Sequence, residues 1–348
     1  MKRACNLLQE LKPVVLMVLV QIVYAAGNVI YKLAINDGMN MTVAAAYRLI
    51  LASAFTIPVA LIFDRKKRPR ITWRVLFMAF LCGLFGGNLF LNLYTEALAL
   101  TSVTLMLTVV NLIPGITFVM AVLFGLEKLN FGAAEGKAKV VGTIIGISGA
   151  MVLIFVKGFE INIWSPKINL MHPHQNQNGH MASHLDFSNT LLGVSCAIGS
   201  CCSFSLYFIV QAKMIEAYPS FHSSIALICT MGAIQAVVVA LFFERDWNQW
   251  KLSYNIRLLT VLYTGIVNSG IVGVVIVWCI KIRGPLFVSI FNPLQLLLGA
   301  VAAYLTLNEK LYLGSLLGAV LIVCGLYTVL WGKGKEAEKM TQLETTRV

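Results

Sequence analysis

Ten apolar stretches of about 20 residues, separated by short polar segments, cover almost the whole of this chain. A helix needs about 20 residues to cross the hydrocarbon core of a bilayer, which is roughly 30 Å thick. Strands of a membrane barrel would alternate in polarity, whereas these runs are continuously apolar. The pattern therefore predicts an all-α polytopic membrane protein with ten transmembrane helices, at residues 13–34, 42–63, 73–95, 102–125, 139–157, 188–211, 221–243, 257–280, 285–306 and 312–332.

The composition and the distribution of charge agree with this prediction. Hydrophobic residues make up 58% of the chain and charged residues 12%, a balance that excludes the soluble globular classes. If the N-terminus is cytoplasmic, the inner segments carry 19 Lys and Arg residues and the outer segments carry 6. Because such residues are retained on the cytoplasmic side, both termini are predicted to be cytoplasmic. The net charge of +12 then indicates the lipid bilayer as partner, and no nucleic acid.

A polar segment at 158–187 divides the ten spans into two groups of five. Because five is odd, the second group must enter the membrane in the opposite orientation to the first. Inverted repeats are typical of secondary transporters, which bind substrate near the midplane between the repeats. The predicted layout is a cytoplasmic N-terminus at 1–12, a first five-helix repeat at 13–157, an extracytoplasmic loop at 158–187, a second five-helix repeat at 188–332 and a cytoplasmic tail at 333–348.

Polar motifs recur in the same order in the two groups of spans. Lys32 matches Lys213, and the FDR sequence at Asp64 matches the FER sequence at Glu244. Further along, NLIP and GLEKL in the first group resemble FNPL and LNEKL in the second. These matches indicate an internal duplication, because a shared apolar composition would not preserve polar residues in order and at a similar spacing.

Five segments carry a resemblance to a known family: YKLAINDGMN, AAAYRLILA, FDRKKRPRITW, NLIPGITFVMAVLFGLEKL and FNPLQLLLGAVAAYLTLNEKL. They are similar to the plant EamA-type branch of the drug/metabolite transporter superfamily, whose members are called walls-are-thin-related or nodulin-like proteins and UmamiT amino-acid facilitators. The resemblance covers both groups of spans. It implies two inverted five-helix EamA repeats and transport of amino acids, auxin or related small organic solutes. The membrane is not uniform within the family, and for this chain the plasma membrane is predicted over the tonoplast.

Ionisable residues inside spans are costly in lipid and are therefore candidates for function. Lys32, Arg48 and Glu96 are predicted at similar depth in the first three spans, where they could meet. The alternative is a purely structural cluster, or a Lys32 side chain that reaches the interface. Arg48 aligns with Cys229, so this cation occurs in one repeat only. A guanidinium can hold a carboxylate through two parallel hydrogen bonds, which makes Arg48 a candidate anion-binding or gating residue.

Uncharged polar residues within the spans are further candidates for substrate binding. In the first span they recur at spacings of three and four, which places them on one face that must look toward the bundle interior or an aqueous path. Hydrogen bonding between helices, without substrate contact, is the alternative. The positions are Gln21, Tyr24, Asn28 and Tyr31 in the first span, Asn88 and Asn92 in the third, and Asn268 and Ser269 in the eighth.

Prolines occupy corresponding positions in the fourth and ninth predicted spans. Asn111 and Pro114 stand in one span, and Asn292 and Pro293 in the other. A proline inside a helix removes one backbone hydrogen bond and kinks the helix, which can expose a carbonyl to a cavity. We expect these four residues to line the transport pathway, with an ordinary packing kink as the alternative.

No catalytic, metal or cofactor site is predicted. Glu127 and Glu309 stand beside lysines at predicted helix ends, where ion pairs are favoured over proton carriage. The four histidines in the 158–187 segment are irregularly spaced, unlike the fixed ligands of a zinc site. The chain contains no HExxH, GxSxG or phosphate-binding loop sequence, which argues against an enzyme and against direct drive by ATP.

The sequence thus favours a secondary transporter of small organic solutes that works by alternating access. Amino acids rank first as substrates, and auxin-like weak acids are the alternative. From another class, a membrane receptor or channel subunit is the alternative, although it would not explain the duplication. Glu96 is the candidate for coupling to protons, with flow down a gradient as the other mode. The sequence indicates no oligomeric state.

Overall fold

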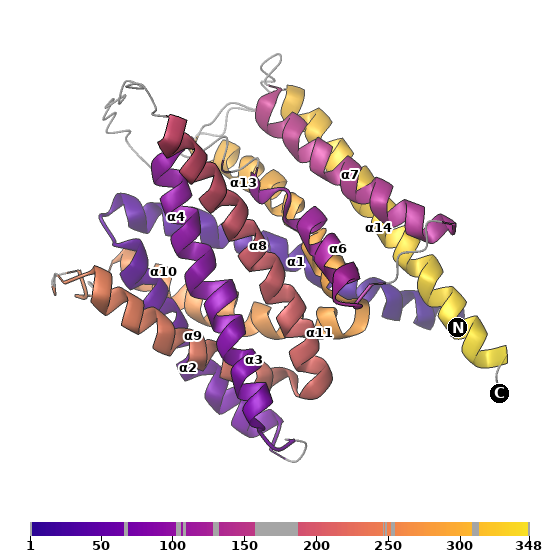
Figure 1. Ribbon diagram of the computed structural model, residues 1–348, viewed down its shortest axis with the longest axis horizontal. Helices are drawn as coiled ribbons and strands as arrows, with labels where there is room; N and C mark the ends of the chain where they lie inside the picture. The colour runs from indigo at the N-terminus through magenta and orange to yellow at the C-terminus, as the bar shows by residue number, and fades with distance from the viewer. Residues whose placement is uncertain are drawn as a thin grey trace.

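The computed structural model describes residues 2–65, 69–101, 106, 109–127, 132–156, 187–245, 247, 249–251, 255–307 and 313–346. All regular secondary structure in these residues is helical, as the continuous apolar runs predict. Figure 1 shows the helices gathered into one bundle. The all-α prediction therefore holds throughout the described ranges.

The described helices fall into two series separated by the predicted outer loop. The first series contains α1 (Lys2–Asn36), α2 (Met41–Phe63), α3 (Trp73–Gly83), η1 (Leu84–Leu89), α4 (Phe90–Leu100), α6 (Ile113–Leu123) and α7 (Ala134–Phe155). The second contains α8 (Phe187–Ala217), α9 (Phe221–Phe243), α10 (Ile256–Leu262), η2 (Tyr263–Ile271), α11 (Val272–Arg283), α12 (Pro285–Ser289), α13 (Asn292–Leu307) and α14 (Leu313–Thr346). In each series the third helix is continuous and carries a π-helical stretch at its centre, η1 or η2.

Seven helices in the described residues are long and apolar enough to cross a membrane: Leu11–Tyr31, Met41–Phe63, Trp73–Ala97, Leu191–Ala217, Phe221–Phe243, Ile256–Arg283 and Leu317–Glu336. They coincide with seven of the ten predicted spans. The fourth and ninth predicted spans hold shorter apolar helices, because turns at 111–112 and 290–291 interrupt them. The fifth coincides with α7, which has three charged residues in its first two turns. The count of ten crossings therefore stays a prediction.

α2 and α9, the second helices of the two series, pack against each other in antiparallel fashion. At one end the Asp64 carboxylate accepts hydrogen bonds from the Ser223 N–H and hydroxyl, each at 2.8 Å, and from the Ser220 hydroxyl. At the other end Glu244 accepts a bond of 2.6 Å from Nδ2 of Asn40, the residue that caps α2. Carboxylates are favoured at helix N-termini by the unpaired N–H groups and the helix dipole. The two carboxylates matched in the sequence repeat thus each bind the start of the other half's helix.

α7 and α14, the last helices of the two series, also pack antiparallel, and they lie side by side along one edge of the bundle (Figure 1). Glycines bring their backbones together. A Cβ added at Gly142 would lie 2.8 Å from the Gly325 carbonyl oxygen, and a Cβ added at Gly325 would lie 2.4 Å from the Gly146 nitrogen. Small residues permit such close approach in membranes, where helices associate through packing rather than through exclusion of water.

The largest cluster of buried apolar side chains among the described residues draws on both halves. It includes Met17 of α1 and Phe208 of α8, together with Phe287 and Phe291 around α12. The halves therefore share one core and do not fold as separate bodies.

The segments outside the predicted repeats are described in part. α1 begins at Lys2 and α14 continues to Thr346, so the predicted N-terminal segment and most of the predicted tail are helical. The predicted outer loop, 158–187, lies outside the described residues except for its last residue, which begins α8.

Candidate functional site

Arg48 lies in α2, seven residues and therefore about 10 Å from the start of the helix. Its Nε donates a hydrogen bond of 2.7 Å to the Ser269 hydroxyl in η2, and the residue is half-buried. Within the described ranges, no carboxylate lies within ion-pair distance of this guanidinium, and its remaining N–H groups have no hydrogen-bond partner. In the described part of the bundle, Arg48 is thus a cation that a neutral hydroxyl positions and no acid neutralises.

Aromatic and thiol side chains surround this guanidinium. Arg48 interacts electrostatically with Tyr24 and Tyr31 of α1 and with Cys229 of α9. Tyr207 of α8 interacts in turn with Tyr24 and Cys229. We call Tyr24, Arg48, Tyr207, Cys229 and Ser269 the Arg48 cluster. Because its members come from α1 and α2 of one half and from α8, α9 and η2 of the other, the cluster lies between the halves.

A pocket of about 210 Å³ lies between the helices that carry Arg48 and Ser269, and no residue of the Arg48 cluster lines it. Its wall is formed by α2, the start of α9, η2 and α11, and it includes Thr56, His222 and Gly270. Gly270, which is one residue after Ser269, is the point of the lining that lies nearest to the Arg48 cluster in the sequence. Apart from Thr56 and His222 its lining is apolar, which suits the body of an organic molecule better than a bare ion.

Two of the three candidate asparagines of the third helices, Asn88 and Asn268, lie in π-helical segments, a feature often found at functional sites. Asn88 in η1 is 8% exposed, and its Nδ2 donates to Gln235 Oε1 at 3.1 Å. Gln235 is held by a bond of 2.9 Å from its Nε2 to the Phe80 carbonyl oxygen. Asn268 in η2 is 7% exposed, and its Oδ1 has no partner among the described residues. The two equivalent positions therefore differ in their hydrogen bonding.

The predicted polar face of the first span is only partly buried. Gln21 is fully buried with an unpartnered Oε1 in the described structure, and Tyr24 is half-buried. Tyr31 donates to the Met41 carbonyl oxygen at 3.4 Å. Asn28 is exposed although it lies two turns from Gln21 on the same face. The inward face of α1 is thus closed at its centre and accessible nearer the Asn40 end.

We predicted that the side chains of Lys32, Arg48 and Glu96 could contact one another, and this stays a prediction. Glu96 is exposed in α4, as is Asn92 one turn earlier, and the described residues show no contact between Glu96 and Arg48. The side chain of Lys32 lies outside the described part of the chain. The structure therefore assigns Arg48 a partner in the second half instead of one in α4.

The structure corrects the predicted position of the prolines. Pro114 and Pro293 do not kink the middle of continuous helices; each is the second residue of a helix, α6 or α13, that begins after a turn. A proline fits there because an N–H group in the first turn of a helix has no acceptor within the helix, so no hydrogen bond is lost. Asn111 is buried in the turn before α6, and Asn292 begins α13. Both halves thus contain a broken fourth helix.

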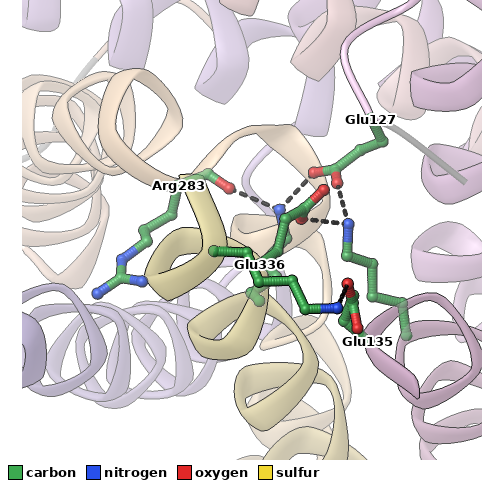
Figure 2. Close-up of polar contacts among 7 residues, drawn as sticks. Glu127, Glu135, Arg283 and Glu336 are labelled. Carbon is green, nitrogen blue, oxygen red and sulfur yellow. Dashed lines mark hydrogen bonds and ion pairs between the residues drawn. The ribbon is translucent and has the colours of Figure 1, made fainter. Parts of the chain in front are cut away.

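A second polar cluster lies where α6 ends and α7 begins (Figure 2). The buried Glu127 carboxylate lies 3.1 Å from Lys139 Nζ and also pairs with Lys333 Nζ. Lys139, whose side chain is fully buried, pairs in addition with Glu336. Lys333 Nζ donates a further bond of 2.8 Å to the Arg283 carbonyl oxygen. Each buried charge therefore has an opposite charge beside it, as burial requires.

This ion network joins the two halves at one end of the bundle. Glu127 follows α6, Lys139 belongs to α7, and Lys333 belongs to α14. The chain turn after α11 completes it: Gly284 has a φ of +84°, and a Cβ there would lie 3.0 Å from Glu127 Oε1. Glu127 is ion-paired, as predicted, and its described partners lie 12 and 206 positions away in the sequence. Glu309 lies outside the described residues.

Several residues of these clusters were missed by the sequence argument. Tyr207 and Gln211, joined by a bond of 3.0 Å, are four residues apart on α8, so the polar-face reasoning used for the first span could have found them. Gln235 lies in α9, in a continuous apolar run, and gave no such signal. Lys139 and Lys333 entered only as interface cations in the charge count.

Known proteins share this architecture. The model of the EamA-like transporter family matches residues 11–155 and again residues 191–331. WAT1-related protein At1g68170 of Arabidopsis thaliana is 42% identical over 330 residues, which are 95% of this chain and 92% of the relative. WAT1-related protein At1g25270 of the same plant is 41% identical over 326 residues, 94% and 91% of the two chains. A solved crystal structure, 16% identical, has the same fold with a TM-score of 0.66 over 92% of this chain and 96% of that one.

Apolar helices of membrane-spanning length, in two matched halves that share a core, define an integral, multi-pass membrane protein built by duplication. The two family matches and the identity of 41–42% to plant relatives show that the chain belongs to the EamA-like transporter family, among its WAT1-related members. It is a membrane transporter. The resemblance stated from the sequence motifs is thereby confirmed, and so is the duplication.

Proposed function

We propose that this protein is a secondary transporter of small organic solutes that carry a carboxylate, with amino acids as its first substrates. The observation that carries this proposal is the guanidinium of Arg48, which lies between the halves beside the Ser269 hydroxyl. A charge within a membrane span is costly, and it is normally retained for a partner or a function. Since the described residues provide no acid for Arg48, a carboxylate on the substrate is the partner that its two parallel N–H groups suit.

The surroundings of Arg48 support an organic substrate. Tyr24 lies near enough to the guanidinium to interact with it electrostatically, and the pocket between α2, α9, η2 and α11 is mostly apolar. A solute with an anionic end and a carbon body would therefore find both kinds of contact. Auxin-like acids meet the same description, so they are the second candidate class.

We infer that transport proceeds by alternating access without ATP. The antiparallel packing of equivalent helices and the broken fourth helices support two inverted halves that rock around a site at the midplane. The exposed polar residues Asn28, Asn92 and Glu96 support an aqueous approach from the Asn40 end. In this arrangement the ten helices cross the plasma membrane and both termini are cytoplasmic.

Uptake assays test the proposal. Yeast or oocytes expressing the protein are offered labelled amino acids and indole acids, and uptake is compared with that of Arg48→Gln and Arg48→Lys variants at matched surface levels. We expect Arg48→Gln to lose about 10- to 100-fold in uptake, since a hydrogen-bonded charge pair contributes roughly 1.5–3 kcal/mol. Arg48→Lys keeps the charge and should lose less. Wild-type uptake by Arg48→Gln would contradict the role of Arg48, and no uptake of any compound would favour a receptor or channel subunit.

A further inference from the structure

The two halves differ at the asparagines of their π-helical segments. Asn88 and Asn268 stand 180 positions apart, the interval that also separates the matched carboxylates Asp64 and Glu244. Asn88 finds its partner within the protein, because its Nδ2 donates to Gln235 Oε1 at 3.1 Å. Asn268 is equally buried, yet its Oδ1 has no hydrogen-bond partner in the described structure. One of two equivalent amides is therefore unsatisfied.

The repeat explains why Asn268 has no such partner. The residues 180 and 181 positions before Gln235 are Phe55 and Ala54 of α2, and neither has a polar side chain. α2 therefore carries no amide at the position that matches Gln235. A buried acceptor without a donor costs free energy, and native proteins contain few of them. A bound ligand that donated a hydrogen bond there would remove this cost.

Asn268 lies next to the residue that positions Arg48. Ser269, the next residue along η2, accepts the 2.7 Å bond from Arg48 Nε, and consecutive Cα atoms are about 3.8 Å apart. The Asn268 amide packs against Gly27 of α1, where an added Cβ would lie 2.3 Å from Nδ2 and 3.3 Å from Oδ1. The amide nitrogen is thus the atom nearer to α1. Glycine leaves the room that this side chain occupies, so its orientation is held by packing.

Three other buried polar atoms lack a partner in the described residues, on Gln21, Gln211 and Tyr218. Of these four unpartnered atoms, only Asn268 Oδ1 belongs to a residue that is next to Ser269 in the chain. It is also an acceptor and cannot donate, so it does not suit a carboxylate. The group that it suits is a donor, and an ammonium group is a strong one.

We propose that Asn268 Oδ1 accepts a hydrogen bond from the ammonium group of a substrate whose carboxylate is bound by Arg48. The proposal rests on the carboxylate-binding role of Arg48 proposed above. The cation comes from the first half and the acceptor from the second, so the site is complete only when the halves are together. It selects α-amino acids over carboxylates of the same shape that have no amine.

Matched pairs of ligands test this selection. Each pair is an amino acid and the same molecule without its amine: alanine and propanoate, glutamine and glutaramate, phenylalanine and 3-phenylpropanoate. Binding is measured as the rise in Tm of the purified full-length protein with ligand concentration, and uptake is measured in expressing yeast. For at least one pair, we expect the amino acid to act at a concentration about tenfold or more below that of its partner.

Three variants locate the selectivity. Asn268→Ala removes the acceptor, so the preference for the amine should disappear while the affinity for 3-phenylpropanoate stays within about twofold of the wild-type value. Asn268→Asp keeps an acceptor of the same shape and should keep the preference. Asn88→Ala, the matched change in the other half, should lower Tm but leave the ratio between the two ligands of a pair unchanged.

The outcomes separate this inference from the proposed function. If desamino acids bind the wild-type protein as tightly as amino acids, or if Asn268→Ala keeps the preference, the inference is wrong while carboxylate transport stands. If the preference is seen in binding but no uptake occurs, the recognition site stands and the transport proposal fails. If none of the six compounds binds, both are overturned. Should Asn268→Ala fail to fold, Asn268→Leu, which keeps the volume of the side chain but has no acceptor, takes its place and should likewise lose the preference.

Discussion

At the scale of single residues, the partner of a buried charge indicates its role. Lys139 and Arg48 both lie within helices of the bundle, but Lys139 is paired with Glu127 and Glu336, whereas Arg48 contacts the neutral Ser269. A buried charge with an opposite charge beside it has a structural role, because removing either partner leaves the other buried and uncompensated. A buried charge held by a neutral group keeps its electrostatic attraction for a ligand. The sequence predicted that this cation occurs in one repeat only. It could not predict that the described residues place no acid beside Arg48.

Asp64 gives a prediction at this scale. Burial by itself would raise the pKa of this carboxyl, but hydrogen bonds from Ser220, Ser223 and His222 lower the pKa below its ordinary value. These bonds therefore stabilise the folded protein at neutral pH, and their contribution is lost as the pH falls below about 4. We expect Asp64→Asn to be less stable than wild type by about 1–3 kcal/mol at pH 7, with the difference closing toward pH 3. Thermal unfolding in detergent between pH 3 and 7 measures it.

The control for this prediction keeps the carboxylate and removes the two hydroxyls that donate to it. A double variant, Ser220→Ala with Ser223→Ala, keeps the Ser223 N–H and His222 as donors, so it should show part of the loss of stability at pH 7, and that part should also close at low pH. A difference between wild type and Asp64→Asn that stays constant from pH 7 to pH 3 would contradict the lowered pKa.

At the scale of elements, the unusual backbone features come in pairs. Both third helices contain a π-helical stretch, and both fourth helices are interrupted by a turn before a proline. Features that are present in both halves are properties of the repeated unit itself. Close backbone contact between α7 and α14 is another property of this kind, since it needs glycine on both helices.

Two glycines on these helices allow a matched test of the contact. A Cβ at Gly325 would lie 2.4 Å from the Gly146 nitrogen, whereas a Cβ at Gly146 would have nothing within 4 Å. We expect Gly325→Ala to lower the free energy of unfolding by about 1–3 kcal/mol, because the helices must move apart. Gly146→Ala should be neutral or stabilising by up to about 1 kcal/mol, since alanine favours the helix. Equal effects of the two substitutions on Tm would show that the helices do not pack in this way.

At the scale of the whole molecule, equivalent helices run in opposite directions. α2 is antiparallel to α9, and α7 is antiparallel to α14, so the halves are related by a rotation that reverses the helix directions. The Asp64 and Glu244 contacts lie at opposite ends of the α2–α9 pair and are both made in the same structure. This helix pair is therefore fixed at both of its ends in this structure.

The orientation of the halves in the membrane can be tested with tags. Epitope tags at the two ends of the chain should be found on the same, cytoplasmic face, because ten crossings return the chain to its starting side. A tag inserted in the 158–187 segment, after five crossings, should be found on the opposite face. Selective permeabilisation of expressing cells distinguishes the faces. Terminal tags on different faces would exclude ten crossings.

The sequence by itself determined the helical class, the positions of seven spans, the duplication and the family. These properties depend on hydropathy along the chain and on short motifs, because every backbone polar group in lipid must be satisfied within its own helix. Only the tertiary structure decided which polar side chains meet. Arg48 and Ser269 are 221 positions apart, and Glu127 and Lys333 are 206 apart. Such contacts depend on how the two halves pack against each other, and no period in the sequence encodes that packing.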